Sequence, residues 1–227
     1  MPYDAPMDHL AGVSALLIDF EGTLVGFQWQ LEAGEADLRR TMVEHGFDAA
    51  AIARESYAEM WNRALRGAGS SGSRADLERW LQPVYDRWDA DAATRWQPRE
   101  TAAELLVRLR AGGMPVGVVS NVGAKWVDET LGKFALRELI DVLVSRNDVE
   151  LMKPAGEGLR KAAELLGTSP SAALMVGDSV TDVLAARDAG ARVAIIRGGE
   201  STSTAFAANP PDLYVERLVD VADLLGL

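Results

Sequence analysis

The chain has 227 residues, of which 48% are hydrophobic and 25% are charged, which suits one large folded domain or two unequal ones. Its 34 acidic and 23 basic residues give a formal net charge of −11, which argues against a nucleic-acid-binding surface, and its four lysines are too few for a polybasic membrane patch. It has no cysteine, which excludes disulfides, thiolate metal ligands and a cysteine nucleophile.

The first twelve residues, MPYDAPMDHLAG, have neither a cationic start nor an apolar centre, so we expect no secretory signal. No apolar run approaches the roughly 20 residues that a membrane helix needs. We therefore expect a cytoplasmic protein with no membrane or nucleic-acid partner. The sequence does not decide between a monomer and a homodimer.

Five short apolar runs predict buried strands, at residues 13–19, 114–120, 141–145, 172–178 and 191–197. They are rich in β-branched residues and alternate little, which is typical of strands covered on both faces. Helical patterns precede, separate and follow the later runs, near 99–111, 124–139, 155–167, 180–189 and 215–226. This alternation predicts an α/β fold in which helices cover both faces of a parallel sheet.

Residues 27–97 interrupt the alternation after the first strand. They contain five of the six tryptophans and no lysine, and they predict helices but no strand, near 32–45, 49–66 and 74–90. The run GAGSSGSR at 67–74 predicts a flexible connection inside this segment. We therefore expect a helical domain inserted into an α/β core. The expected boundaries are 1–25 and 98–227 for the core and 26–97 for the inserted domain.

The first strand ends in the sequence Asp-Phe-Glu-Gly-Thr, residues 19–23. Asp19 and Glu21 lie two residues apart, so both side chains point to the same side of an extended chain. Two like charges at one strand end are costly unless a positive charge is shared between them. An ordinary turn is the favoured interpretation of this stretch alone. The alternative is a nucleophilic carboxylate at Asp19 with a proton-transfer group at Glu21.

Two later stretches have both a structural and a chemical interpretation. Ser120 and Asn121 follow the second strand and precede a helix, where Ser and Asn are preferred N-caps, and the cap is favoured for this pair alone. Their hydroxyl and backbone N–H could instead hold phosphate oxygens. Lys153 precedes Pro154 at the start of a helix, where a lone lysine is usually solvated. Lys153 could instead neutralise a phosphate and the carboxylate that attacks it.

The fourth strand ends in VGDSVTD. Ser179 and Asp182 have the spacing of a helix capping box, but a cap does not require the second carboxylate, Asp178. Together the two aspartates resemble a hard-cation site built from oxygen ligands. Because parallel strands end at one edge of the sheet, these aspartates should converge with Asp19 and Glu21. We therefore expect Mg²⁺ there, which binds one or two carboxylates together with substrate phosphate.

With the stretches DFEGT, SN, KP and GDSVTD in this order, the chain resembles the phosphatase branch of the haloacid dehalogenase-like superfamily. The segment after the first motif matches the helical cap placement of its phosphoglycolate-phosphatase-like members. The resemblance covers nearly the whole chain from residue 13 and implies a Rossmann-like core with an inserted α-helical cap domain. It implies a Mg²⁺-dependent phosphatase that acts on a small phosphorylated metabolite, phosphoglycolate being one candidate, through an aspartyl-phosphate.

The resemblance also implies a role for each motif residue. Catalysis would depend on the nucleophile Asp19, the acid and base Glu21, and the cation Lys153. Phosphoryl oxygens would be held by Ser120 and the Asn121 backbone, with Thr23 supporting the first turn. The Mg²⁺ ligands would be Asp19, the backbone carbonyl of Glu21, and Asp178, with Asp182 assisting through water.

Glu21 departs from this family pattern, which usually has aspartate at that position. The extra methylene matters because a misplacement of about 1 Å can cost on the order of 10²-fold in rate. Either the loop has shifted to fit the longer acid, or turnover is slow, or the carboxylate only tunes the metal. The length mismatch alone predicts that Glu21→Asp raises turnover of a generic phosphate ester.

Two alternative functions remain at this point. A metal-independent 2-haloacid dehalogenase would use the same nucleophilic aspartate, but it would have tyrosine in place of Glu21, and the Asp178 and Asp182 pair also counts against it. A catalytically weakened binding or regulatory protein with the same fold is supported by Glu21 alone. The intact Asp19 and Lys153 weigh against that interpretation.

Overall fold

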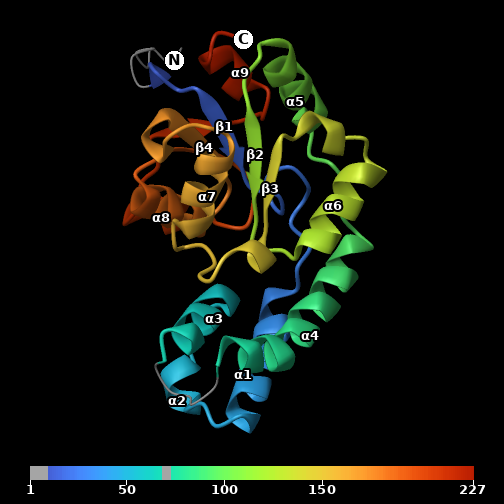
Figure 1. The fold of residues 1–227 in the computed structure, drawn as a ribbon, viewed down its shortest axis with the longest axis vertical. Coiled ribbons are helices and arrows are strands. Elements are labelled where there is room, and N and C mark those ends of the chain that lie inside the picture. Colours follow the sequence, from blue (N-terminus) through green and yellow to red (C-terminus); the bar gives the residue numbers. More distant parts are fainter. Residues whose placement is uncertain (1–9, 68–72) are drawn as a thin grey trace.

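A parallel sheet with the strand order β3-β2-β1-β4-β5-β6 organises the computed structural model, which describes residues 10–67 and 73–227 (Figure 1). The strands are β1 (Ala15–Ile18), β2 (Val116–Val119), β3 (Val142–Val144), β4 (Ala173–Gly177), β5 (Arg192–Ile196) and β6 (Leu213–Val215). Every pair of neighbours is parallel. The predicted α/β fold with a parallel sheet is confirmed, and the five predicted strands are all present.

Helices pack on both faces of this sheet (Figure 1). They are α5 (Ala102–Ala111), α6 (Ala124–Lys133), α7 (Glu157–Leu165), α8 (Val180–Ala189) and α9 (Asp220–Leu224), with 3₁₀ turns at Arg137–Leu139, Arg146–Asp148, Pro170–Ala172 and Ser203–Ala207. Successive side chains of a strand point to opposite faces. In β1, Leu17 therefore joins the apolar cluster under α7 and α8, whereas Leu16 and Ile18 join the cluster under α5, α6 and α9.

The helical insertion, residues 26–97, lies beyond the carboxyl ends of the strands (Figure 1). Its helices are α1 (Leu31–Glu44), α2 (Ala49–Ile52), α3 (Tyr57–Leu65) and α4 (Arg74–Ala93). The prediction of one helix over 49–66 is wrong, because Ser56 and Glu59 form a capping box that begins α3 separately. The middle of the predicted connection at 67–74 lies outside the described residues.

Buried contacts join the insertion to the sheet domain. The apolar cluster under α5 and α6 continues without a break into the insertion. Trp96, fully buried, packs edge-on against Phe20 with ring centroids 5.0 Å apart. The Trp61 indole N–H donates to the Glu150 carbonyl at 2.9 Å. Asn62 exchanges two hydrogen bonds of 2.8 Å with the backbone of Met152. The insertion therefore has a defined position over the strand ends.

Two other element boundaries differ from the predictions. The helix predicted over 124–139 stops at Lys133, because Ala135 takes a left-handed conformation with φ 56°, and a 3₁₀ turn follows. The helix predicted over 215–226 begins only at Asp220, because Leu213–Val215 pairs with β5 as a sixth strand. In the described part of the chain, no helix is long and apolar enough to cross a membrane.

The two-sided core makes a prediction about β1. Leu17 is fully buried between the sheet and α7, so Leu17→Ala should lower the free energy of unfolding by about 2–5 kcal/mol through lost burial and a residual cavity. Leu165→Ala is the matched control, because the Leu165 side chain is 59% exposed. Urea denaturation measures both variants. Equal losses for Leu17 and Leu165 would contradict this description of the core.

Candidate active site

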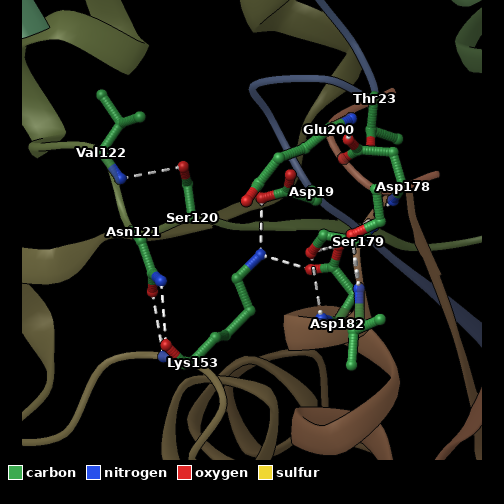
Figure 2. Close-up of polar contacts among 12 residues, drawn as sticks. Asp19, Thr23, Ser120, Asn121, Val122, Lys153, Asp178, Ser179, Asp182 and Glu200 are labelled. Carbon is green, nitrogen blue, oxygen red and sulfur yellow. Dashed lines mark hydrogen bonds and ion pairs between the residues drawn. The ribbon is translucent and has the colours of Figure 1, made fainter. Parts of the chain in front are cut away.

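Two aspartates end neighbouring strands at the same edge of the sheet. Asp19 directly follows β1, Asp178 directly follows β4, and these strands pair in register. One carboxylate oxygen from each, together with one from Asp182 in the first turn of α8, lies within 4.8 Å of the others (Figure 2). All three side chains are buried. The predicted convergence of these carboxylates is therefore present.

Lys153 lies inside this group of carboxylates (Figure 2). Its Nζ donates to Asp19 Oδ1 and to Asp182 Oδ1, both at 2.6 Å, and the side chain is buried. Burial opposes its charge, but the adjacent Asp182 and Asp19 carboxylates raise the pKa of Lys153 above its usual range. Lys153 is therefore a cation at neutral pH, shared between two aspartates.

Asn121 fixes the backbone of Lys153. Its Oδ1 accepts from the Lys153 N–H at 2.9 Å, and its Nδ2 donates to the Lys153 carbonyl at 3.0 Å. The family resemblance assigns a role to the Asn121 backbone and the cap interpretation assigns its side chain to α6, so the contact of this side chain with Lys153 is a new finding. Ser120 is buried next to it, and its Oγ accepts from the Val122 N–H at 3.1 Å. Neither residue caps α6, because Gly123 is the N-cap, so the cap interpretation of this pair is wrong.

Thr23 and Gly22 bring the first motif against Asp178. The Thr23 hydroxyl donates to Asp178 Oδ1 at 2.9 Å. Gly22 has φ +91°, and a Cβ there would lie 2.2 Å from Asp178 Oδ2, so only glycine permits this close approach. Asp182 uses its second oxygen within the capping box, where it accepts from the Ser179 N–H and hydroxyl. The capping-box interpretation of Ser179 and Asp182 is therefore confirmed.

Glu21 is held by the insertion. Its Oε1 accepts from the backbone N–H groups of Gln28 and Trp29 at 2.8 and 2.7 Å, and from the indole N–H of Trp96 at 2.8 Å. These donors lie on the two chain connections between the insertion and the sheet. Burial raises the pKa of Glu21 to about 7, although the three hydrogen bonds oppose that shift. The surrounding chain thus accommodates glutamate at position 21, although its side chain is one methylene longer than that of aspartate.

Glu200 is a site residue that the sequence did not predict. It lies beyond β5, after two glycines, and its N–H donates to Asp178 Oδ2 at 2.5 Å. Its side chain points toward Asp19 (Figure 2), and both residues line one small cavity. Burial raises its pKa to about 7, helped by Asp182 and Asp19. The only sequence signal was its place after a strand that ends at the same edge of the sheet.

The carboxylates outnumber the cation beside them. Burial raises the pKa of Asp19, and Lys153 only partly opposes the effect of burial and of the neighbouring aspartates. Burial and Asp182 likewise raise the pKa of Asp178. A divalent cation would stabilise these groups as carboxylates. The donor set, carboxylate oxygens close together beside a backbone turn, fits Mg²⁺, which prefers oxygen ligands.

Two small cavities adjoin at this site. The first, about 30 Å³, is lined by Asp19, Glu21, Ser120, Lys153 and Glu200, among others. The second, about 20 Å³, has Trp29, Tyr85, Asp89 and Arg146 in its wall. Five residues line both, namely Glu21, Phe27, Tyr57, Asn121 and Val122. A larger cavity of about 800 Å³ lies between α3, α7 and α8, but the carboxylates of the cluster do not line it.

A buried ion pair connects α4 to the loop that carries Asn121. Arg146 donates to Asp89 at 2.9 Å, to Asp86 at 3.0 Å and to the Asn121 carbonyl at 3.1 Å. Asp89 also accepts from the Gly123 N–H at 3.0 Å. Arg146 and Asp89 are both buried. The pair therefore fixes the insertion against the loop after β2, and no local sequence pattern indicates it.

The sequence and the fold are similar to those of known proteins. A family model described as a haloacid dehalogenase-like hydrolase matches residues 13–190. The pyrophosphatase PpaX of Bacillus cereus (strain AH820) is 34% identical over 127 residues, which are 56% of this chain and 59% of that relative. The chain thus spans less than two thirds of the length of this curated relative.

Two solved structures have the same fold. A predicted phosphoglycolate phosphatase from Haemophilus somnus 129PT has a TM-score of 0.67 and 18% identity, covering 95% of this chain and 99% of its own. CbbY from Rhodobacter sphaeroides, in complex with phosphate, has a TM-score of 0.64 and 23% identity, covering 95% of this chain and 100% of its own. At these identities the likeness supports the fold alone.

The ion pair between α4 and the loop after β2 makes a stability prediction. Arg146→Met leaves the buried Asp89 carboxylate without its cation, so it should lower the free energy of unfolding by about 3–5 kcal/mol. Arg187→Met, which removes an exposed pair with Asp212, should cost about 1 kcal/mol or less. Urea denaturation compares the two. A similar small loss of unfolding free energy in both variants would show that the buried pair contributes little to stability.

Proposed function

Because the chain belongs to the haloacid dehalogenase-like hydrolase family, we propose that it is a Mg²⁺-dependent phosphatase of a small phosphorylated metabolite, acting through an aspartyl-phosphate at Asp19. The observation that carries this proposal is the position of Lys153 Nζ, 2.6 Å from Asp19 and 2.6 Å from Asp182, in a buried cluster of three aspartates. Such a site has a nucleophile, a fixed cation and oxygen ligands for a metal in one place.

In the first step, a carboxylate oxygen of Asp19 attacks the phosphorus of the substrate. The bond between phosphorus and the leaving-group oxygen breaks, and Glu21 gives its proton to that oxygen. Lys153 offsets the charge of the attacking carboxylate and of the transferring group, and Ser120 with the Asn121 N–H holds the phosphoryl oxygens. The products are an aspartyl-phosphate, a free alcohol and the Glu21 carboxylate.

In the second step, the Glu21 carboxylate takes a proton from a water molecule as the water oxygen attacks phosphorus. The bond between phosphorus and the Asp19 oxygen breaks, which releases inorganic phosphate and restores the Asp19 carboxylate. Glu21 ends protonated, as it began. The three hydrogen bonds from Gln28, Trp29 and Trp96 hold its carboxyl group in one position for both transfers.

The metal site is part of the same proposal. Asp19, Asp178 and the Glu21 backbone carbonyl would hold Mg²⁺, which when bound supplies positive charge for the phosphoryl oxygens. Asp182 would assist through water, since its own oxygens accept from Lys153, Ser179 and the Asp178 N–H. Thr23 positions Asp178 through their 2.9 Å hydrogen bond.

The arrangement of the chain supports a division into two domains. We assign residues 1–25 and 98–227 to the core domain and 26–97 to a cap domain whose helices cover the site and exclude water. A cytoplasmic location, expected from the sequence, stays part of the proposal. The names of the similar proteins suggest two candidate substrates, pyrophosphate and phosphoglycolate.

The proposal predicts how turnover depends on Asp19 and on metal. With the small phosphate esters hydroxyethyl phosphate and phosphoglycolate, the wild-type protein should release phosphate in Mg²⁺ and lose that activity in EDTA. Asp19→Asn should abolish turnover because the amide cannot attack phosphorus. Asp128→Asn, at a surface position, is the matched control and should keep full activity. Turnover that survives EDTA, or that survives Asp19→Asn, would contradict the proposed chemistry, and metal-independent release of halide from a haloacid would support the dehalogenase instead.

The length of Glu21 alone predicts faster turnover in Glu21→Asp, but its contacts in the structure predict the opposite. An aspartate here would be one methylene too short to reach the N–H groups of Gln28 and Trp29 and the indole of Trp96, which would remain buried and unpaired. Glu21→Asp should therefore lower kcat, on the order of 10- to 100-fold. Glu164→Asp, on the exposed side of α7, is the control. Equal or faster turnover by Glu21→Asp would show that these contacts do not position the acid.

A further inference from the structure

The leaving group of the proposed reaction has a defined place. It must lie next to Glu21, which protonates its oxygen, whereas the phosphoryl group lies between Asp19, Ser120 and Lys153. Next to Glu21 the first cavity adjoins the second, and the two share a wall made of Glu21, Phe27, Tyr57, Asn121 and Val122. The two volumes, about 30 and 20 Å³, leave room for a small group only. The wall therefore determines which leaving groups fit.

This wall is aromatic and contains no cation that is available to a substrate. The Trp29 and Tyr57 rings pack together with centroids 5.1 Å apart, and Phe27 lies beside them in the wall. Among the described residues that line the two cavities, the cations are Lys153 and Arg146. Lys153 is shared by Asp19 and Asp182, and Arg146 is bound by Asp86, Asp89 and the Asn121 carbonyl.

The acidic groups nearby give an anion no counter-charge. The Glu21 carboxyl, which is protonated and neutral when the substrate binds, lines both cavities, and the Glu200 carboxyl lines the first. In its ionised form Glu200 would repel a second anion, because like charges placed together at a binding surface disfavour binding. A carboxylate or phosphate on the leaving group would also lose its hydration shell without gaining a counter-charge. Pyrophosphate and phosphoglycolate both carry such a charge on the leaving group.

Three arginines of the insertion, Arg63, Arg66 and Arg74, lie away from this wall. Arg63 pairs with Glu55, and Arg74 pairs with Glu78 at 2.8 Å. Arg63 and Arg66 line the larger cavity between α3, α7 and α8, which neither Asp19 nor Glu21 lines. They therefore do not lie in the wall next to Glu21.

Tyr57 gives the wall one neutral polar group. Its hydroxyl accepts from Asn121 Nδ2 at 3.4 Å and, within residues 10–67 and 73–227, donates to no group. Its backbone is fixed, because the N–H donates to Glu35 at 3.2 Å and the carbonyl accepts from the Tyr85 hydroxyl at 2.7 Å. Burial raises the pKa of Tyr57 well above its usual value, so the phenol keeps its proton. The hydroxyl can donate to a substrate oxygen.

We infer that the substrate is the phosphate monoester of a small uncharged alcohol, whose neutral leaving group packs on Phe27, Trp29 and Tyr57 and accepts a hydrogen bond from the Tyr57 hydroxyl. This inference rests on the proposed phosphatase function for the position of the leaving group. It adds to that function a preference for neutral over anionic leaving groups. Pyrophosphate and phosphoglycolate are therefore not preferred substrates.

Binding to the Asp19→Asn variant tests this inference without turnover. Calorimetry in Mg²⁺ should compare hydroxyethyl phosphate with phosphoglycolate, which have nearly the same size but end in a hydroxymethyl group and a carboxylate. The neutral ester should bind at least about tenfold more tightly, a difference that one unfavourable charge readily produces. Tyr57→Phe should weaken hydroxyethyl phosphate and leave phosphoglycolate unchanged.

A charge placed in the wall should change the preference. Phe27→Arg, added to Asp19→Asn, should bring the two affinities together or reverse their order, whereas the uncharged control Phe27→Met should keep the preference for the neutral ester. Thermal unfolding checks that both variants are folded. If Phe27→Arg does not fold, the affinities of the two esters for Asp19→Asn alone still show whether the site prefers the neutral ester.

The outcomes separate the inference from the proposed function. Equal or tighter binding of phosphoglycolate, or failure of both esters to bind, would overturn the inference. Phosphate release from either ester by the wild-type protein, lost in Asp19→Asn, tests the phosphatase itself. A preference for hydroxyethyl phosphate without such turnover would support the inferred ligand class and reject the proposed catalysis.

Discussion

The ion pairs of Lys153 with Asp19 and Asp182 are the contacts on which the rest of the site depends. A buried ammonium group needs carboxylates around it, and buried carboxylates need a cation. The fold supplies both, because β1 and β4 end side by side and the Asn121 side chain fixes the Lys153 backbone beside them. One lysine cannot offset Asp178 and Glu200 as well. The remaining negative charge is the physical reason to expect a divalent cation at this edge of the sheet.

Glu21 connects this charge cluster to the helical insertion. Its backbone belongs to the turn after β1, while its carboxyl group accepts from both chain connections of the insertion, at Gln28 and Trp29 on one side and at Trp96 on the other. The buried pair of Arg146 and Asp89 adds a second link, from α4 to the loop after β2. The position of the insertion and the position of the Glu21 carboxyl group therefore depend on each other. The wall of the leaving-group site lies between the hydrogen bonds of Glu21 and the ion pair of Arg146 with Asp89.

The site residues that directly follow a strand could be predicted from the sequence. Asp19 and Asp178 were predicted because parallel strands end at one edge, and the Ser179–Asp182 capping box was predicted from its spacing. Glu200 belongs to no motif, and Arg197 and two glycines separate it from β5, so it carries no strand-end signal. The pair of Arg146 and Asp89 was missed for another reason: contacts between residues far apart in the chain leave no local pattern. The strand β6, with three residues, is too short for a periodic pattern. The start of α3, in contrast, has a local signal, because Ser56 and Glu59 have the spacing of a capping box.

The proposed chemistry requires that the buried aspartates bind a divalent cation. Calorimetric titration of the wild-type protein and of Asp178→Asn with Mg²⁺ tests it directly, with Asp128→Asn as the control. We expect one bound Mg²⁺ per chain and a higher Tm in Mg²⁺ for the wild type and for Asp128→Asn, and loss of both effects in Asp178→Asn. Equal binding by Asp178→Asn, or no binding by the wild type, would contradict it.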